Sequence, residues 1–183
     1  VALISPDKED ENLKIFCKEN GVELFEFNPR SQFWTSQYAE SRKYFLEDID
    51  SNVALKEKHV WSLKYNTSIN PWNHIRPRIL YLVYKLIKKF PIIRKWYKTN
   101  EQKYLLSQEA EILIRTLNPQ FLVSTYPVSF SEAMLLKAGN NNVSTTTIIH
   151  LLSWYNISCK GHFPELAKKY IAWGPIMKEE FMD

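Results

Sequence analysis

Residues 120–152 read QFLVSTYPVSFSEAMLLKAGNNNVSTTTIIHLL and carry the strongest structural signal in the chain. The run QFLVST at the start is apolar, which is typical of a strand buried in a sheet. A helix can begin at Ser129 or Ser131 and reach Ala138, where the sequence Gly-Asn-Asn-Asn ends it. The β-branched run Val143–Leu152 follows as a second strand. A strand, a helix and a strand in close succession predict a βαβ unit with parallel strands.

The same alternation continues on both sides of this stretch. Val1–Ser5 and Val22–Phe27 are apolar runs on either side of a helical segment that ends at Asn20. Toward the other end of the chain, Tyr170–Trp173 has the pattern of a short strand, and Pro175 is a residue with which helices often begin. These elements together predict an α/β fold with a Rossmann-like parallel sheet flanked by helices.

The middle of the chain is less regular. Tyr38–Asp48 has weak helical spacing, and residues 59–75, which are rich in Trp and Asn, are expected to form an irregular loop. Helical periodicity returns at residues 76–90, and Pro91 interrupts it before a second helix from about Ile92 to Leu117. The inward positions expected for this second helix are Trp96, Leu105, Ile112 and Leu113.

The ends and the cysteines suggest what kind of protein this is. The chain begins at Val1 rather than at methionine and stops at Asp183 within a helical pattern, so we expect residues 1–183 to be a single domain of a longer protein. It has no run of about 18 apolar residues, and no segment is expected to span a membrane. Cys17 and Cys159 are too few for a disulfide framework and favour free thiols in the cytoplasm.

The small number of glycines argues against a phosphate-binding loop. The four glycines have neither GxGxxG nor GxxxxGK[ST] spacing. A backbone that holds a diphosphate needs such glycines for close approach, so we expect no dinucleotide site and no cofactor in this domain. The four histidines lack the spacing of metal ligands, and no metal site is expected. His150, inside an apolar strand, is expected to be a hydrogen-bonded structural residue.

Ligands of open α/β sheets bind outside the carboxyl ends of the strands, and the predicted strand ends here are polar and aromatic. They are Ser5–Asp7, Ser124–Pro127 and Ser153–Asn156. Hydroxyl and amide groups can bond sugar hydroxyls, and aromatic rings can stack on the C–H faces of a sugar. Two interpretations remain open. These residues bind a sugar, or Trp154 and Tyr155 only cover the edge of the sheet.

A long basic and aromatic stretch is the second candidate. Between Glu57 and Glu101 the sequence has ten cations and no acidic residue, with aromatic residues interleaved. Such a stretch can be a solvated helix face over an aromatic core, a helix on an anionic membrane surface, or a nucleic-acid-binding element. The net charge of only +4 disfavours nucleic acid. The residues expected to contact a membrane surface are Lys85, Lys88, Lys89, Arg94, Lys95 and Trp96.

Residues 119–181 also contain an ordered set of short motifs. A strand is followed by Ser-Trp-Tyr-Asn at 153–156, Lys-Gly at 160–161, Ala-Trp at 172–173 and Lys-Glu at 178–179. The order and spacing resemble the N-terminal half of bacterial GT-B-type glycosyltransferase-like proteins of surface polysaccharide biosynthesis. The motif of that family reads Ser-Trp-Asp-Asn, Lys-Gly, Val-Trp and Lys-Glu. The chain departs from it at Tyr155, where the family has Asp, and this departure puts catalytic activity in question.

The resemblance implies a GT-B architecture in which this chain is the acceptor-side half. A nucleotide sugar would bind through a C-terminal donor domain, and a surface-polysaccharide or lipid-linked acceptor would meet this half at the inner face of the plasma membrane, without nucleic acid. The alternatives are a non-catalytic carbohydrate- or membrane-surface-binding module, and another GT-B enzyme such as a sugar-nucleotide epimerase or a glycerophosphate transferase. No catalytic residue is identified. The substrate-binding residues would be Tyr126, Ser153, Trp154, Tyr155, Asn156 and Lys160.

Overall fold

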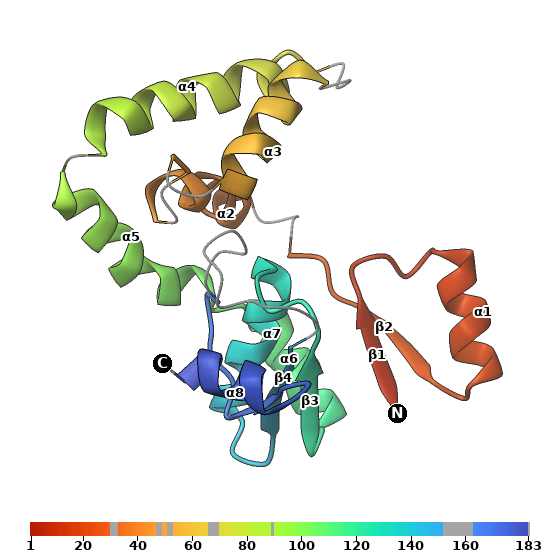
Figure 1. Cartoon of the computed structure of the whole chain (residues 1–183). Helices are drawn as coiled ribbons and strands as arrows, with labels where there is room; N and C mark the ends of the chain where they lie inside the picture. The colour runs from red at the N-terminus through yellow and green to blue at the C-terminus, as the bar shows by residue number, and fades with distance from the viewer. Residues whose placement is uncertain are drawn as a thin grey trace.

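The computed structural model in Figure 1 has three parts that follow one another along the chain. A βαβ unit comes first, then helices α2 to α5, which we call the helical arm, and then a unit that contains β3, β4 and β5. Small parallel sheets flanked by helices form the first and last parts, so the predicted α/β class is confirmed. The structure describes residues 1–29, 33–46, 49–50, 53–65, 70–88, 90–151 and 163–182.

The N-terminal unit has the predicted strand–helix–strand order, and its strands pair in parallel. Asp10 caps the helix between the strands. Its Oδ1 accepts the N–H groups of the second and third helical residues at 2.9 and 3.2 Å. Gly21 follows the helix with a φ of 61°, a left-handed conformation that favours glycine. The elements are β1 (Ala2–Ser5), α1 (Glu11–Glu19) and β2 (Glu23–Glu26).

The helical arm contains one helix that the sequence pattern did not predict. Residues 59–75 were expected to be irregular, but residues 59–64 belong to α3 and residues 72–75 to α4. Helix α3 forms because its side chains pack against α2 and α4. His59 is buried and its Nδ1 lies 3.2 Å from the hydroxyl of Tyr44, while Leu55 packs against a core that includes Tyr84. These contacts are distant in sequence, so local periodicity does not reveal them. The helices are α2 (Phe33–Phe45), α3 (Val53–Lys64), α4 (Trp72–Ile87) and α5 (Pro91–Tyr104).

The single helix expected over residues 92–117 is two helices, α5 and α6 (Gln108–Leu117). Helix α5 ends at Tyr104, and Ser107 caps the start of α6, because its Oγ accepts the N–H of Ala110 at 3.3 Å. Leu105, between the helices, is fully buried. The positions predicted to point inward divide into Leu105 and Leu113, which pack in the core, and Trp96 and Ile112, which are exposed and correct the prediction.

The C-terminal unit has the predicted parallel strands in the order β3-β4-β5. Helix α7 runs three residues past its predicted end, so Gly139 lies inside it. A Cβ atom on Gly139 would lie 2.8 Å from both Leu122 Cδ2 and Thr147 Cγ2. Glycine is therefore required for close packing of α7 on the sheet rather than for ending the helix. The elements are β3 (Phe121–Ser124), α7 (Phe130–Asn141), β4 (Thr146–His150), β5 (Lys169–Ile171) and α8 (Pro175–Met182).

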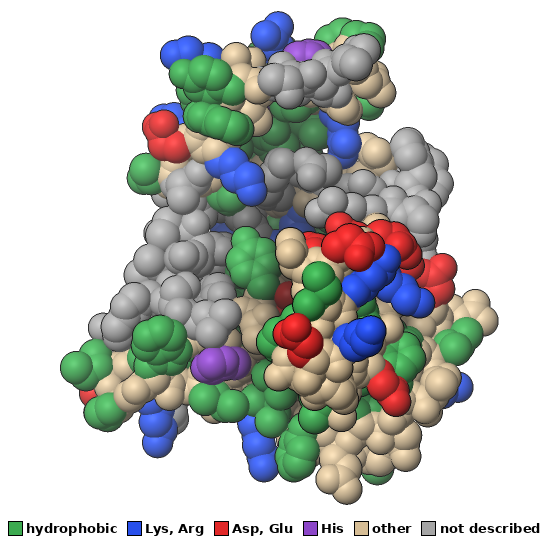
Figure 2. Space-filling view, turned by 90° about the vertical axis from the view of Figure 1, so that its right-hand side faces the viewer, with side chains coloured by type: hydrophobic (Ala, Val, Ile, Leu, Met, Phe, Trp, Pro, Cys, Tyr) green, Lys and Arg blue, Asp and Glu red, His purple; other side chains and the backbone are tan. Residues whose placement is uncertain are grey.

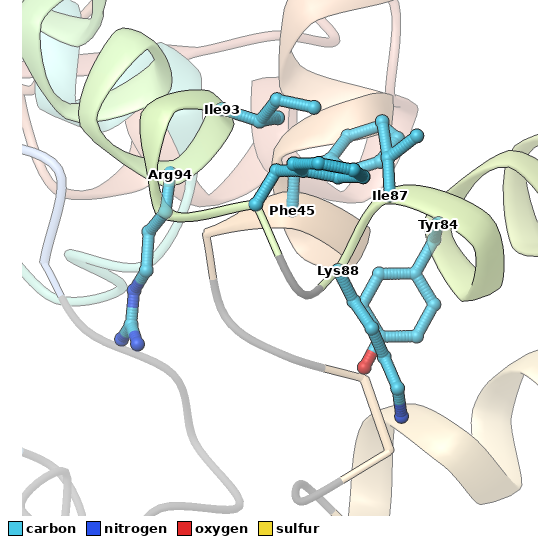
Figure 3. A pocket seen from close by; sticks show the side chains of 7 residues that line it. Phe45, Tyr84, Ile87, Lys88, Ile93 and Arg94 are labelled. Carbon is cyan, nitrogen blue, oxygen red and sulfur yellow. The ribbon is translucent and has the colours of Figure 1, made fainter.

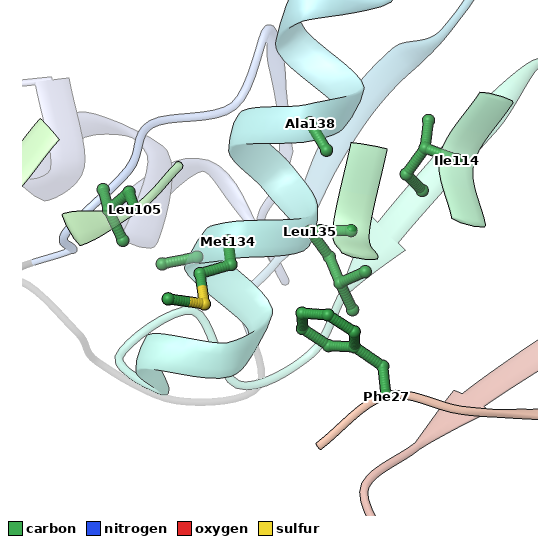
Figure 4. Packing of buried hydrophobic residues seen from close by; sticks show 8 residues of the cluster. Phe27, Leu105, Ile114, Met134, Leu135 and Ala138 are labelled. Atoms are coloured by element: carbon green, nitrogen blue, oxygen red, sulfur yellow. The ribbon is translucent and has the colours of Figure 1, made fainter. Parts of the chain in front are cut away.

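Within the described residues the strands form two sheets rather than one, since no ladder joins β1 to β3. Both sheets nevertheless turn one face to the same core. Phe27 of the first unit packs with Ile114 of α6 and with α7 (Figure 4). Ile4 of β1 and Leu122 of β3 pack against the same cluster. Figure 1 shows α1 on the other side of β1 and β2 from α6. The two sheets thus share one layer of helices, and this layer joins the first and last parts.

Candidate functional site

One carboxylate organises the loop at the carboxyl end of β3. Oε2 of Glu132, in the first turn of α7, accepts hydrogen bonds from Ser124 Oγ at 2.5 Å and from the N–H groups of Thr125 and Tyr126 at 3.1 and 3.0 Å. These N–H groups already bond a carboxylate, so they are not donors for a bound phosphate. The loop therefore presents side chains, rather than a backbone anion site, to a ligand.

Sequence reasoning missed Glu132, although a signal for it is present. Ser129 and Glu132 have the spacing of a capping box, in which the glutamate normally bonds back to the serine N–H. Here the carboxylate of Glu132 bonds the β3 loop instead, and Ser129 Oγ lies 2.8 Å from Ser131 Oγ. The capping pattern identifies the residue, but only the fold shows what it bonds.

Tyr126 is the predicted substrate-binding residue that the structure describes. Its side chain is exposed on the loop after β3, as an acceptor-stacking ring requires. Strand β4 runs parallel to β3 and ends at His150, so the chain leaves β4 at the same edge of the sheet as Tyr126. The other predicted positions, Ser153, Trp154, Tyr155, Asn156 and Lys160, lie outside the described residues.

The helical arm accounts for much of the aromatic content of the chain. Tyr38 stacks on Tyr97 and Tyr104, with ring centroids 5.4 and 4.2 Å apart, and Phe45 stacks on Tyr97 at 5.2 Å. The Tyr38 hydroxyl donates to the Tyr97 carbonyl at 2.7 Å, and burial raises the pKa of the Tyr38 phenol. A buried ion pair between Arg42 and Glu101 also joins α2 to α5. These rings are structural, which leaves the exposed aromatics as candidates for binding.

A ridge of exposed apolar side chains runs along α4. Its members recur every three or four residues, so they lie on one side of the helix. Tyr81 and Tyr84 of the same helix pack instead in the core of the helical arm, with Tyr44 and Leu55. Arg78 follows one side of the ridge and Arg76 the other, as their positions in the helical turn require. The residues of this α4 ridge are Trp72, Ile75, Ile79, Leu82 and Leu86, whose exposed fractions range from 44% to 76%.

The cations near the α4 ridge are not equivalent. Nζ of Lys85 and of Lys88 lie 2.7 and 2.8 Å from the same oxygen of Asp50, a residue outside the basic stretch. Hydrogen bonds from Lys85 and Lys88 hold the pKa of Asp50 well below its usual range, and the same contact with Asp50 raises the pKa of Lys85. The charges of these two lysines are therefore partly balanced. Arg94, Lys95 and Trp96 of α5 are exposed, while Lys89 lies outside the described residues.

A cavity of about 260 Å³ lies where α4 meets α5. Figure 3 shows Phe45, Ile87 and Ile93 grouped together, with Lys88 and Arg94 extending to the same side of this apolar group. The wall is completed by Tyr84 and by Phe90, which is itself largely exposed.

Charge is distributed unevenly over the molecule. Figure 2 shows acidic side chains gathered over α1, whereas the helices at the top carry mainly hydrophobic and Lys or Arg side chains. Residues 1–29 contain seven acidic and three basic residues, in contrast to the stretch between Glu57 and Glu101. No described helix is long and apolar enough to cross a bilayer. Within the described ranges, no cluster of three His, Cys, Asp or Glu residues suits a metal ion.

Comparison with protein-family models, with curated proteins and with solved structures found no match to this chain. Its function must therefore be inferred from the two surfaces described above, the β3 loop with Tyr126 and the α4 ridge with its cations.

Proposed function

We propose that this chain is the acceptor-side domain of a glycosyltransferase that works at an anionic membrane surface. The activity would transfer a sugar from a nucleotide sugar to a surface-polysaccharide or lipid-linked acceptor, on the cytoplasmic face of the membrane. The observation that carries the proposal is the α4 ridge, an exposed apolar row flanked by cations on a helix that is not long and apolar enough to span a bilayer.

The chemistry of the ridge favours a lipid surface over nucleic acid. Nucleic-acid interfaces are polar and strongly positive, and an apolar row of Trp, Ile and Leu gains little from contact with phosphates. In the interfacial region of a bilayer, each of these half-exposed side chains contributes about 1 kcal/mol, and each nearby cation adds up to about 1 kcal/mol with anionic lipid. Contributions of this size give reversible, peripheral binding.

The glycosyltransferase part of the proposal is supported by the motif order at residues 153–179 and by the loop after β3. Tyr126 offers an exposed ring at a strand end, where ligands of α/β folds bind. The finer fold assignment, a single Rossmann-like sheet of the GT-B type, belongs to the same proposal. The substitution of Tyr155 for the family's Asp keeps a non-catalytic binding module as the second candidate.

Vesicle co-sedimentation tests the membrane part. The chain should bind vesicles that contain phosphatidylglycerol much more strongly than neutral phosphatidylcholine vesicles, and added salt should weaken this binding. Replacing Leu82 and Leu86 by Gln should reduce binding about thirtyfold, because two contributions of about 1 kcal/mol are lost. Ile112→Gln, an exposed apolar residue on α6, serves as the control and should change little. If the double variant binds vesicles as before but no longer self-associates, the ridge binds a second copy of the chain rather than a membrane.

Ligand binding in solution tests the carbohydrate part. Calorimetry should show no low-micromolar dissociation constant for UDP-, GDP- or CDP-linked sugars, because the chain has no glycine-rich phosphate loop and the N–H groups of Thr125 and Tyr126 already bond Glu132. Saturation-transfer NMR with a panel of oligosaccharides should show contact with at least one glycan, lost in Tyr126→Ala and kept in Tyr65→Ala, an exposed control directly after α3. Tight binding of a nucleotide sugar, or equal glycan contact in both variants, would contradict the proposed acceptor role.

A further inference from the structure

The cavity between α4 and α5 combines two kinds of wall. Phe45, Ile87, Phe90 and Ile93 form an apolar wall contributed by α2, the end of α4, the α4–α5 link and α5. Lys88 and Arg94 supply cationic groups on one side of it, as Figure 3 shows. A wall of this composition is complementary to an amphipathic anion, which has a charged head next to a hydrocarbon chain.

The local charge favours an anion even though Asp50 is near. Asp50 binds both Lys85 and Lys88, so the three groups together carry one net positive charge. Arg94 adds a second positive charge at the same cavity, and it makes no ion pair with any residue among those described. A guanidinium donates a fork of hydrogen bonds that matches the geometry of phosphate oxygens.

The size and the position of the cavity indicate which part of a ligand it holds. Its volume of about 260 Å³ is at or below the lower end for sites that enclose a small molecule, so only part of a larger ligand fits. The cavity lies beside the end of the α4 ridge, because Leu86 of the ridge directly precedes Ile87 of the wall and Phe90 is exposed at the rim. A ligand held here can continue into whatever covers the ridge.

We propose that this cavity binds the phosphate group of a membrane lipid, between Arg94 and Lys88, with the first carbons of the hydrocarbon chain against Phe45, Ile87, Phe90 and Ile93. The site makes the membrane contact selective for lipid phosphate rather than for negative charge alone. This inference rests on the proposed membrane contact for the orientation of the cavity toward the bilayer.

The test uses the full chain with decyl phosphate below its micelle concentration, and isothermal calorimetry with NMR of isoleucine methyl groups. Decyl phosphate should bind and shift the methyl signals of Ile87 and Ile93. Inorganic phosphate, which lacks the chain, and decyl maltoside, which lacks the charge, should each bind at least about tenfold more weakly. Equal binding of inorganic phosphate would show that the source is free phosphate and would overturn the lipid assignment.

Adjacent residues of α5 provide a matched pair of variants. Arg94 lines the cavity and Lys95 does not, yet both are exposed cations of the same helix. Arg94→Gln should weaken decyl phosphate binding about tenfold, and Lys95→Gln less than about twofold. Equal losses, or unmoved Ile87 and Ile93 signals, would overturn the site. Vesicle binding is read separately, so decyl phosphate binding without vesicle binding would refute the membrane proposal while leaving this site in place.

Discussion

At the scale of single residues, Asp50 shows how one side chain can balance the charge of lysines in a basic stretch of sequence. The sequence between Glu57 and Glu101 contains no acid, and so every lysine in it looks equally available. The fold brings Asp50 from outside the stretch against Lys85 and Lys88. The surface charge of the arm therefore depends on a contact that spans more than thirty positions, which charge patterning along the sequence cannot show.

Asp50→Asn should therefore strengthen binding to anionic vesicles, by about fivefold if one unit of charge near the surface is worth about 1 kcal/mol. The lowered pKa keeps Asp50 ionised in the folded chain, so mild acidification alone should not produce this gain. Acidification should instead destabilise the fold. The ionised Asp50 stabilises the folded chain at a pH above the ordinary carboxyl pKa of about 4, and this contribution is lost as the pH falls toward the lowered pKa of Asp50. The measurement compares the vesicle affinity of Asp50→Asn with that of Glu23→Gln, a control on distant β2. Equal increases in affinity would show that the position of Asp50 beside Lys85 and Lys88 does not matter.

Gly139 gives a second prediction at this scale. In an ordinary helix, Gly→Ala stabilises by about 1 kcal/mol, but overpacking against Leu122 and Thr147 should cost more than that. We expect Gly139→Ala to lower the free energy of unfolding by about 1–2 kcal/mol in urea titration. Gly174→Ala, where no atom lies within 4 Å of the added Cβ, is the control and should be close to neutral. A stabilised Gly139→Ala would mean that α7 does not pack as closely as described.

At the scale of elements, strands in short βαβ units were predictable and the helical arm was only partly so. The segments that form β1, β3 and β4 are apolar and rich in β-branched residues, β2 and β5 contain shorter apolar patterns, and the structure places all five strands near the expected positions. Helix α3 and the break between α5 and α6 depend on packing with α2 and α4 and on the Ser107 cap. At the candidate site, the position of Tyr126 after a predicted strand was enough to predict it as a binding residue. The bonds of Glu132 and the cavity between α4 and α5 could be found only from the folded structure.

The two faces of β3 lead to a prediction about this strand. Leu122 packs against the core, whereas Phe121 and Val123 on the opposite face are more than half exposed. Leu122→Asp should therefore lower the free energy of unfolding by more than about 2 kcal/mol, because it buries an unpaired charge, and Val123→Asp should cost little. Urea titration measures both values, and equal costs would contradict the burial of one face of β3.

At the scale of the whole molecule, the separation of charge suggests an orientation. The acidic N-terminal unit lies away from α4, and an anionic surface would repel it while attracting the basic arm (Figures 1 and 2). The α4 ridge would then face the lipid, and the arm lies between that surface and the strand ends with Tyr126. This arrangement would hold a lipid-linked acceptor near the carboxyl edge of the sheet.

The most direct test is a measurement of depth in the bilayer by electron paramagnetic resonance, with a nitroxide label at position 82 on the α4 ridge or at position 112 on α6. With phosphatidylglycerol vesicles, the label at Leu82→Cys should become accessible to oxygen and protected from a water-soluble nickel complex. The label at Ile112→Cys should keep its aqueous exposure, and neutral vesicles should change neither. Aqueous exposure of both labels on vesicles that have bound the chain would contradict membrane docking through the α4 ridge.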